Sequence, residues 1–99
     1  MFFFCITRAA EASVADWHAR MQFYGGEDPA TGSAAGCAIA WLVRHGLVAS
    51  GHPVILEQGV EMLRPSRLHL HAHLSSGAVS GVFVGGRTIP VASGHLFLP

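Results

Sequence analysis

Residues 33–45 form a segment that is apolar on almost every side of the helix that it predicts. The segment is rich in alanine, carries no charge before Arg44, and is followed by Gly46, a residue type common just beyond a helix end. A helix of about a dozen residues spans roughly 18 Å. Because all its sides are apolar, we expect it to be packed centrally, with the rest of the chain around it.

The rest of the chain predicts short strands rather than a second helix. Residues 9–16 are small and polar, which indicates a loop or a single helical turn. Apolar or alternating runs between glycine, proline and serine turns predict strands at 2–7 (buried), 17–23, 53–57, 67–74, 79–84 and 88–92. Tight turns favour antiparallel neighbours. The predicted fold is α+β (an α/β roll): a mixed, mostly antiparallel sheet wrapped around one central apolar helix.

The charge composition excludes several functions. Of 99 residues, 51% are hydrophobic and 12% charged, and the six cationic residues are all arginine. The lack of lysine excludes Schiff-base catalysis and a P-loop, and no basic patch is available for nucleic acid. So little charge on one small domain suggests apolar faces that are covered by a partner chain.

Two cysteines do not make a disulfide framework, and Cys37, inside the apolar segment, is expected to be a buried thiol. The first residues, 1–6, lack the basic region and cleavage site of a signal peptide. The uncharged run 33–43 is too short to cross a bilayer. We therefore expect a reduced, cytoplasmic protein without membrane association.

The segment 26–36, just before the predicted helix, has the composition of a site. Asp28 follows Glu27 and precedes Pro29, and Thr31-Gly32-Ser33 opens the helix. Unpaired N–H groups at a helix start attract anions, and Gly32 lets a ligand approach the backbone. A carboxylate beside such a turn indicates a small acidic ligand and proton transfer. The alternative is an ordinary helix cap made by these same side chains.

His69, His71 and His73 alternate with apolar residues, so the three imidazoles share one face of a strand. Such neighbours are about 6.5–7 Å apart, and no nearby carboxylate or cysteine would complete a metal shell. We expect this face to meet solvent and predict no metal site.

The sequence Glu-Asp-Pro-Ala-Thr-Gly-Ser-Ala at 27–34 resembles the signature of the PhzF family, the phenazine biosynthesis-like isomerases and epimerases. Further segments agree in order: Arg20-Met21, then Glu-Gln-Gly-Val-Glu-Met-Leu-Arg-Pro-Ser at 57–66, then Val-Gly-Gly-Arg at 84–87 before Gly-His-Leu at 94–96. Together they align nearly the whole chain with the C-terminal half of that family.

The resemblance implies a fold like that of diaminopimelate epimerase, in which two similar lobes enclose a cleft. It implies isomerisation of a small acid by proton abstraction and return at carbon, without cofactor or metal. Asp28 corresponds to a catalytic or polarising acid, and Gly32 and Ser33, with Thr31 in the same cradle, to substrate-binding residues. The family's other acid/base group, a glutamate, lies in an N-terminal lobe. Residues 1–99 are thus expected to form a single C-terminal lobe without that N-terminal lobe, inactive alone.

The second motif departs from the family at Leu63, where Met-Gly-Arg-Pro-Ser has glycine. We expect the polar residues of this loop to tie it down, with Arg64 paired to a carboxylate or to backbone carbonyls. Direct substrate contact is the alternative for these residues, which are Gln58, Glu61, Arg64 and Ser66.

The leading hypothesis is an isomerase lobe for a small carboxylate-bearing metabolite, working as a homodimer or with an N-terminal lobe. Two other hypotheses remain open: a non-catalytic module that binds small anions or self-assembles, and a truncated gene product.

Overall fold

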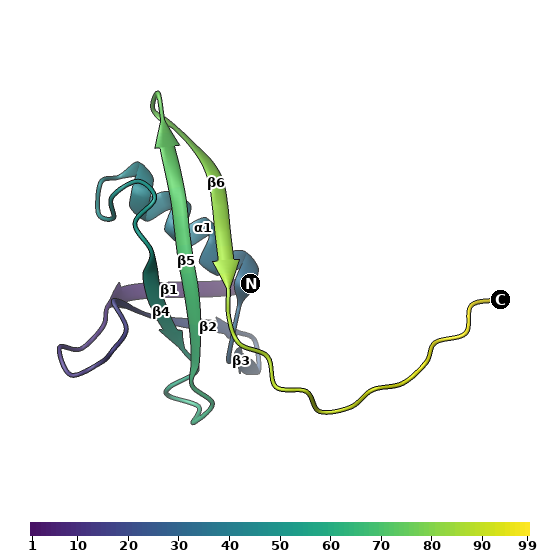
Figure 1. The fold of residues 1–99 in the computed structure, drawn as a ribbon. Helices are drawn as coiled ribbons and strands as arrows, with labels where there is room; N and C mark the ends of the chain where they lie inside the picture. Colours follow the sequence, from purple (N-terminus) through teal and green to yellow (C-terminus); the bar gives the residue numbers. More distant parts are fainter.

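A computed structural model describes all residues, 1–99, and shows one helix and six strands (Figure 1). The elements in chain order are β1 (Phe2–Arg8), β2 (Trp17–Phe23), β3 (Gly26–Asp28), α1 (Gly32–Arg44), β4 (Val54–Gln58), β5 (Ser66–Ser75) and β6 (Ala78–Gly85). The loop at 9–16 and the helix were predicted correctly. The three-residue strand β3 was missed because the Gly25-Gly26 pair indicated only a break in the chain.

The strands form one sheet in the order β1-β2-β4-β5-β6, and β3 also pairs with β2. Only β2 and β4 run parallel, while every other pair is antiparallel. Since β1 occupies one edge of β2 along its whole length, β3 and β4 share the other edge, one after the other. This mixed, mostly antiparallel sheet curls around a single helix, which confirms the predicted fold class.

Helix α1 packs against β5 and β6 through one side only. Its buried residues, Ala35, Ile39, Leu42 and Val43, recur at helical spacing and join the apolar face of the sheet in one core. Trp41 and Cys37 are exposed. The expectation of a helix enclosed on every side is therefore wrong, and so is the buried thiol. Cys37 lies two residues, about 200°, around the helix from Ala35, so it faces away from the sheet.

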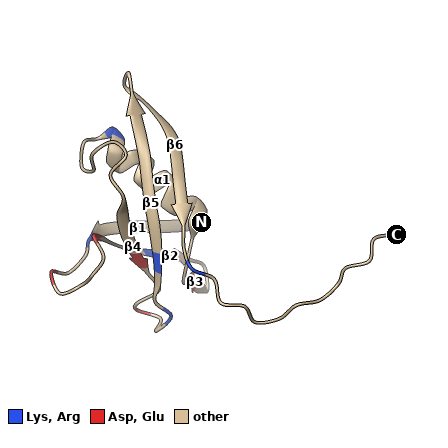
Figure 2. Ribbon diagram, in the orientation of Figure 1, with Lys and Arg blue, Asp and Glu red and all other residues tan.

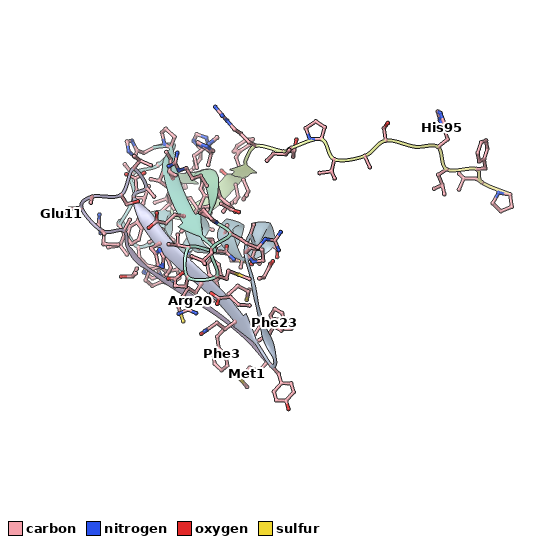
Figure 3. The ribbon with its side chains drawn as sticks, turned by 90° about the horizontal axis from the view of Figure 1, so that it is seen from below. Met1, Phe3, Glu11, Arg20, Phe23 and His95 are labelled. Atoms are coloured by element: carbon pink, nitrogen blue, oxygen red, sulfur yellow. The ribbon has the colours of Figure 1, made fainter.

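Strand β1 forms as predicted, but it is an edge strand and is mostly exposed. Phe4 and Ile6 pack against the core, whereas Phe2 and Phe3 are 72% and 57% exposed. Figure 3 shows Phe3 and Phe23 at the same corner of the molecule as Met1. The prediction that this strand is buried is wrong, because nothing covers its outer side.

The strand predicted at 88–92 is absent. After Gly85 the chain leaves the sheet and extends away from the body to residue 99 (Figure 1). A strand needs a neighbour to satisfy its N–H and C=O groups, and this segment has none within the chain. Pro90 also lacks the N–H that a ladder would use.

On β5 the alternation is as predicted: Leu68, Leu70 and Ala72 are buried, and His69 and His73 are exposed. His71 stacks on Phe83 of β6, with ring centroids 4.4 Å apart. No group of three or more His, Cys, Asp or Glu side chains could hold a metal ion. No helix has both the length and the apolar character needed to cross a membrane. Acidic and basic residues lie side by side where β4 and β5 pair, at Glu57 and Arg67, while β6 has none (Figure 2).

Candidate functional site

The signature segment lies where β3 ends and α1 begins. Asp28 is the last residue of β3 and pairs with Met21, and Thr31 is the N-cap of α1. Only Pro29 and Ala30 separate them, so the turn is short. The sheet therefore fixes one side of the segment and the helix fixes the other.

The Asp28 side chain bonds within this turn and does not cap the helix. Its Oδ2 accepts a hydrogen bond from Thr31 Oγ1 at 2.6 Å, and its Oδ1 has a long contact of 3.5 Å with the Ala30 N–H. A carboxylate that accepts a hydroxyl proton at 2.6 Å forms one of the stronger hydrogen bonds in proteins. One carboxylate oxygen is thus held firmly, and the other has only this long contact.

The start of α1 has no side-chain cap. Thr31 has extended backbone angles (φ −120°, ψ 91°), and its hydroxyl makes no cap hydrogen bond. The first turn also contains no acidic residue. The ordinary capping role considered for Thr31 is therefore excluded. The unpaired N–H groups and the positive end of the helix dipole stay available to an anion.

A pocket of about 510 Å³ opens at this point. Three of the four residues predicted to form the site, Asp28, Thr31 and Ser33, line the pocket; Gly32 lies between them in sequence but is not among its lining residues. The other lining residues are Glu27, Pro29 and an apolar group from β1 and β2, namely Phe2, Met21 and Phe23. The pocket thus offers polar groups on one side and an apolar surface on the other.

Gln58 is the polar residue that sequence reasoning placed in the wrong context. It was expected to tie down the loop that follows it, but it belongs to β4, is fully buried, and makes all its side-chain hydrogen bonds to the Asp28–Thr31 turn. One signal was available in the sequence. Gln58 continues the buried face of β4 after Val54 and Leu56, and a buried amide must find partners.

Gly59 brings the following loop against the same turn. Its φ is +80°, and a Cβ atom there would lie 2.8 Å from the Pro29 carbonyl oxygen and 2.3 Å from that of Arg64. Arg64 donates its backbone N–H to the Gly59 carbonyl, but its side chain forms none of the expected hydrogen bonds or ion pairs. Ser66 pairs with Gln58 in the β4–β5 ladder.

Charged side chains form a chain of contacts on the outer face of the sheet. Arg20 binds Glu27 through two hydrogen bonds of 2.8 and 2.9 Å, and its Nε lies 3.9 Å from Glu61. The hydrogen bond to Glu27 raises the pKa of Arg20, and the same bond lowers the pKa of Glu27. Glu27 is therefore held in its ionised form, paired with Arg20, on the wall of the pocket.

His18 extends this chain to β4. Its Nδ1 lies 3.0 Å from Glu57, its Nε2 contacts Glu61, and Glu57 also accepts a 2.8 Å hydrogen bond from Ser13. Burial lowers the pKa of His18, but the hydrogen bonds to Glu57 and Glu61 raise it more, and the net shift is upward. The hydrogen bond from Ser13, then the contact with His18, lower the pKa of Glu57. Glu61 thus anchors its loop to β2, as expected of a tying residue.

Leu63 has the left-handed backbone (φ +57°) that favours glycine, and its side chain is 88% exposed. The bulky residue is accommodated in solvent rather than in the site.

Residues 2–94 match the family described as phenazine biosynthesis-like proteins, PhzC-PhzF. The chain belongs to the PhzF family. It is 41% identical over 85 residues to a trans-2,3-dihydro-3-hydroxyanthranilate isomerase of Pseudomonas aeruginosa. The aligned region covers 83% of this chain and 31% of the relative. The isomerase of the same name from Pseudomonas fluorescens is 40% identical over 85 residues, and the alignment again covers 83% of this chain and 31% of the relative.

An uncharacterized isomerase of Mesorhizobium japonicum is 38% identical over 73 residues, or 73% of this chain and 24% of the relative. The matched region thus spans less than a third of the length of these curated relatives.

Proposed function

We propose that this chain supplies the Asp28 side of a cofactor-independent isomerase that moves a proton at a carbon atom of a small carboxylate-bearing metabolite. The observation that carries the proposal is the pocket in which Asp28, Thr31 and Ser33 meet at the uncapped start of α1. The membership of the PhzF family and the isomerase names of its relatives support it.

The roles follow from the contacts in the turn. Thr31 holds one oxygen of Asp28, so the other can give a proton to the substrate or polarise it. The N–H groups at the start of α1, with the Ser33 hydroxyl, would hold the substrate carboxylate or the negative charge that develops as the carbon proton leaves. Gly32 lets the ligand approach the backbone there.

If Asp28 donates a proton or polarises the substrate, a second group must act as the base that removes the proton from carbon. In this chain the other carboxylate of the pocket, Glu27, is bound to Arg20 and is a poor base. We propose that the partner group is a glutamate of an N-terminal lobe, which meets this C-terminal lobe across a cleft. On this account the chain alone does not turn over substrate.

The test joins this chain to the rest of a relative. The Pseudomonas aeruginosa isomerase, with the 85-residue region matched here deleted, is mixed with the chain in D₂O and given trans-2,3-dihydro-3-hydroxyanthranilate. We expect deuterium in the product by mass spectrometry, its loss with Asp28→Asn, and no change with Glu11→Gln at an exposed loop position. The proposal fails if sizing shows that the two parts associate and no exchange follows, or if exchange survives Asp28→Asn.

A second candidate, a non-catalytic self-assembling module, is favoured by one observation. Large apolar side chains are exposed at both ends of the chain, among them Phe2, Phe3, Ile89 and Phe97. In this case the chain would form a homodimer through those segments. Sizing over a range of concentrations, with and without small carboxylates, distinguishes the two: a dimer that binds no carboxylate favours the module.

A further inference from the structure

The Gln58 amide contacts the site through both of its polar atoms. Its Oε1 accepts the Thr31 N–H at 3.1 Å, and its Nε2 donates to the Asp28 carbonyl at 2.8 Å and to Thr31 Oγ1 at 2.9 Å. The residue is fully buried, so no water competes for these bonds. A side-chain amide has two N–H donors, and both are used here.

The partners fix which way the amide points. The Thr31 N–H is a donor and must face the amide oxygen, and the Asp28 carbonyl is an acceptor and must face the NH₂ group. A flipped amide would place two donors against each other and two acceptors against each other.

The direction of the next hydrogen bond follows. Because the Gln58 NH₂ group can only donate, Thr31 Oγ1 accepts from it. The single hydroxyl proton of Thr31 is then directed to Asp28 Oδ2, 2.6 Å away. The bonds run one way, from Gln58 through Thr31 to the carboxylate.

We propose that Gln58 is a positioning residue for Asp28, acting through the Thr31 hydroxyl. It touches no substrate; it selects the hydroxyl orientation that holds Oδ2 and leaves Oδ1 for proton transfer. This inference rests on the proposed function of Asp28 for its catalytic consequence, although its structural part stands alone.

The sheet topology makes this arrangement possible. Asp28 pairs with Met21, and Gln58 pairs with Ala19. Met21 and Ala19 lie two residues apart on β2. The ends of β3 and β4 therefore meet along one edge of β2, and the Gln58 side chain spans the junction between sheet and helix.

The first test uses nuclear magnetic resonance of the 99-residue chain. Three-bond couplings report whether the Asp28 side chain keeps one χ1 rotamer. We expect one rotamer in the wild type and in Thr31→Ser, which retains the hydroxyl, and averaging in Gln58→Met and Thr31→Val. The matched controls Gln22→Met and Thr7→Val make the same changes at exposed positions and should leave Asp28 ordered. Methyl shifts of Leu56 and Leu70 check that each variant is folded.

The second test measures deuterium exchange in the mixture described above. We expect Gln58→Met and Thr31→Val each to lower kcat about 10- to 100-fold with little change in KM, since a misplaced group costs about this much. The double variant should lose no more than the worse single variant, because both break the same relay. If Gln58→Met does not fold, Thr31→Val tests the same bonds.

The outcomes separate the two proposals. An Asp28 side chain that stays in one rotamer in the folded Thr31→Val and Gln58→Met proteins overturns the positioning role, as does an unchanged kcat. If the rotamer is lost in these variants but the wild-type mixture never exchanges deuterium, Gln58 positions Asp28 and the proposed function is wrong.

Discussion

Leu63 and Gly59, four residues apart, both have a left-handed backbone, with φ +57° and +80°. A residue with a Cβ atom pays roughly 1–2 kcal/mol for this conformation, whereas glycine does not. The Leu63 side chain is 88% exposed, so it recovers little by packing. The two positions therefore predict opposite responses to substitution.

We expect Leu63→Gly to stabilise the chain. Relief of the backbone strain outweighs the extra freedom that glycine adds to the unfolded chain, and the net gain is about 0.5–1 kcal/mol. Urea unfolding followed by circular dichroism measures it. A loss of stability would show that the exposed Leu63 side chain makes contacts that the structure lacks.

Gly59→Ala should be strongly destabilising and should also disturb the site. The new Cβ would meet the Arg64 and Pro29 carbonyls at 2.3 and 2.8 Å, so backbone must move in addition to the strain, for a cost of about 2–4 kcal/mol. Gly77→Ala is the control, with φ +78° and no atom within 4 Å of the added methyl group. Equal losses for the two variants would contradict the close approach of Gly59 to Pro29.

At the residue scale, the sequence predicted which side chains lie together at the candidate site but not what holds them there. The Glu-Asp-Pro-Ala-Thr-Gly-Ser motif locates Asp28, Thr31 and Ser33, which the structure brings to one pocket. The contacts of Gln58 could not be predicted, because they depend on the registers of β3 and β4 along β2. The Arg64 side chain, expected to pair with a carboxylate or with backbone carbonyls, forms no such contact.

Among the elements, β2, β4 and the loop after β4 are joined by His18 between two carboxylates. The pKa of His18 is raised above the usual 6.5 in the folded chain. The protonated side chain therefore stabilises the fold fully below the unfolded pKa, and this stabilisation is lost as pH rises through the folded pKa. Glu57 and Glu27 have lowered pKa values, and their contribution is lost as pH falls through those values. Arg20, whose pKa is raised, keeps its charge throughout this range.

The chain should therefore be more stable at mildly acidic pH than at alkaline pH. Urea unfolding at pH 5.5 and 8.5 should show a lower unfolding free energy at the higher pH, and His18→Gln should reduce this difference. His52→Gln, at an exposed position without side-chain hydrogen bonds, is the matched control. The same pH dependence in His18→Gln and the wild type would contradict the bridging role of His18.

Local patterns predicted most elements because period and turn residues are written in the sequence. Alternation gave β2 and the buried face of β5, and Gly46 marked the end of α1. Burial was harder to predict, because it depends on which elements pack against each side of a strand or helix. The edge position of β1 and the solvent side of α1, where Cys37 lies, are properties of the assembled sheet.

For the whole molecule, the most unusual feature is the segment after Gly85, which extends away from the body (Figures 1 and 3). Its apolar residues Ile89, Val91 and Phe97 are more than 80% exposed. Removing residues 88–99 should change the unfolding free energy by less than about 0.5 kcal/mol, because these side chains pack on nothing in the chain. Urea unfolding measures the change. A larger loss would show that the segment packs on the domain.

The measurement that tests the site most directly is a titration of the isotope-labelled chain with benzoate, which combines a carboxylate with an apolar ring. We predict that the amide signals of Gly32 and Ser33 move together with the Phe23 ring signals, with a Kd in the millimolar range. Such joint movement would show that one ligand contacts both the start of α1 and the apolar wall of the pocket, which Phe23 lines. Signals that do not move, or that move only in residues 88–99, would contradict the assignment of this pocket as the functional site.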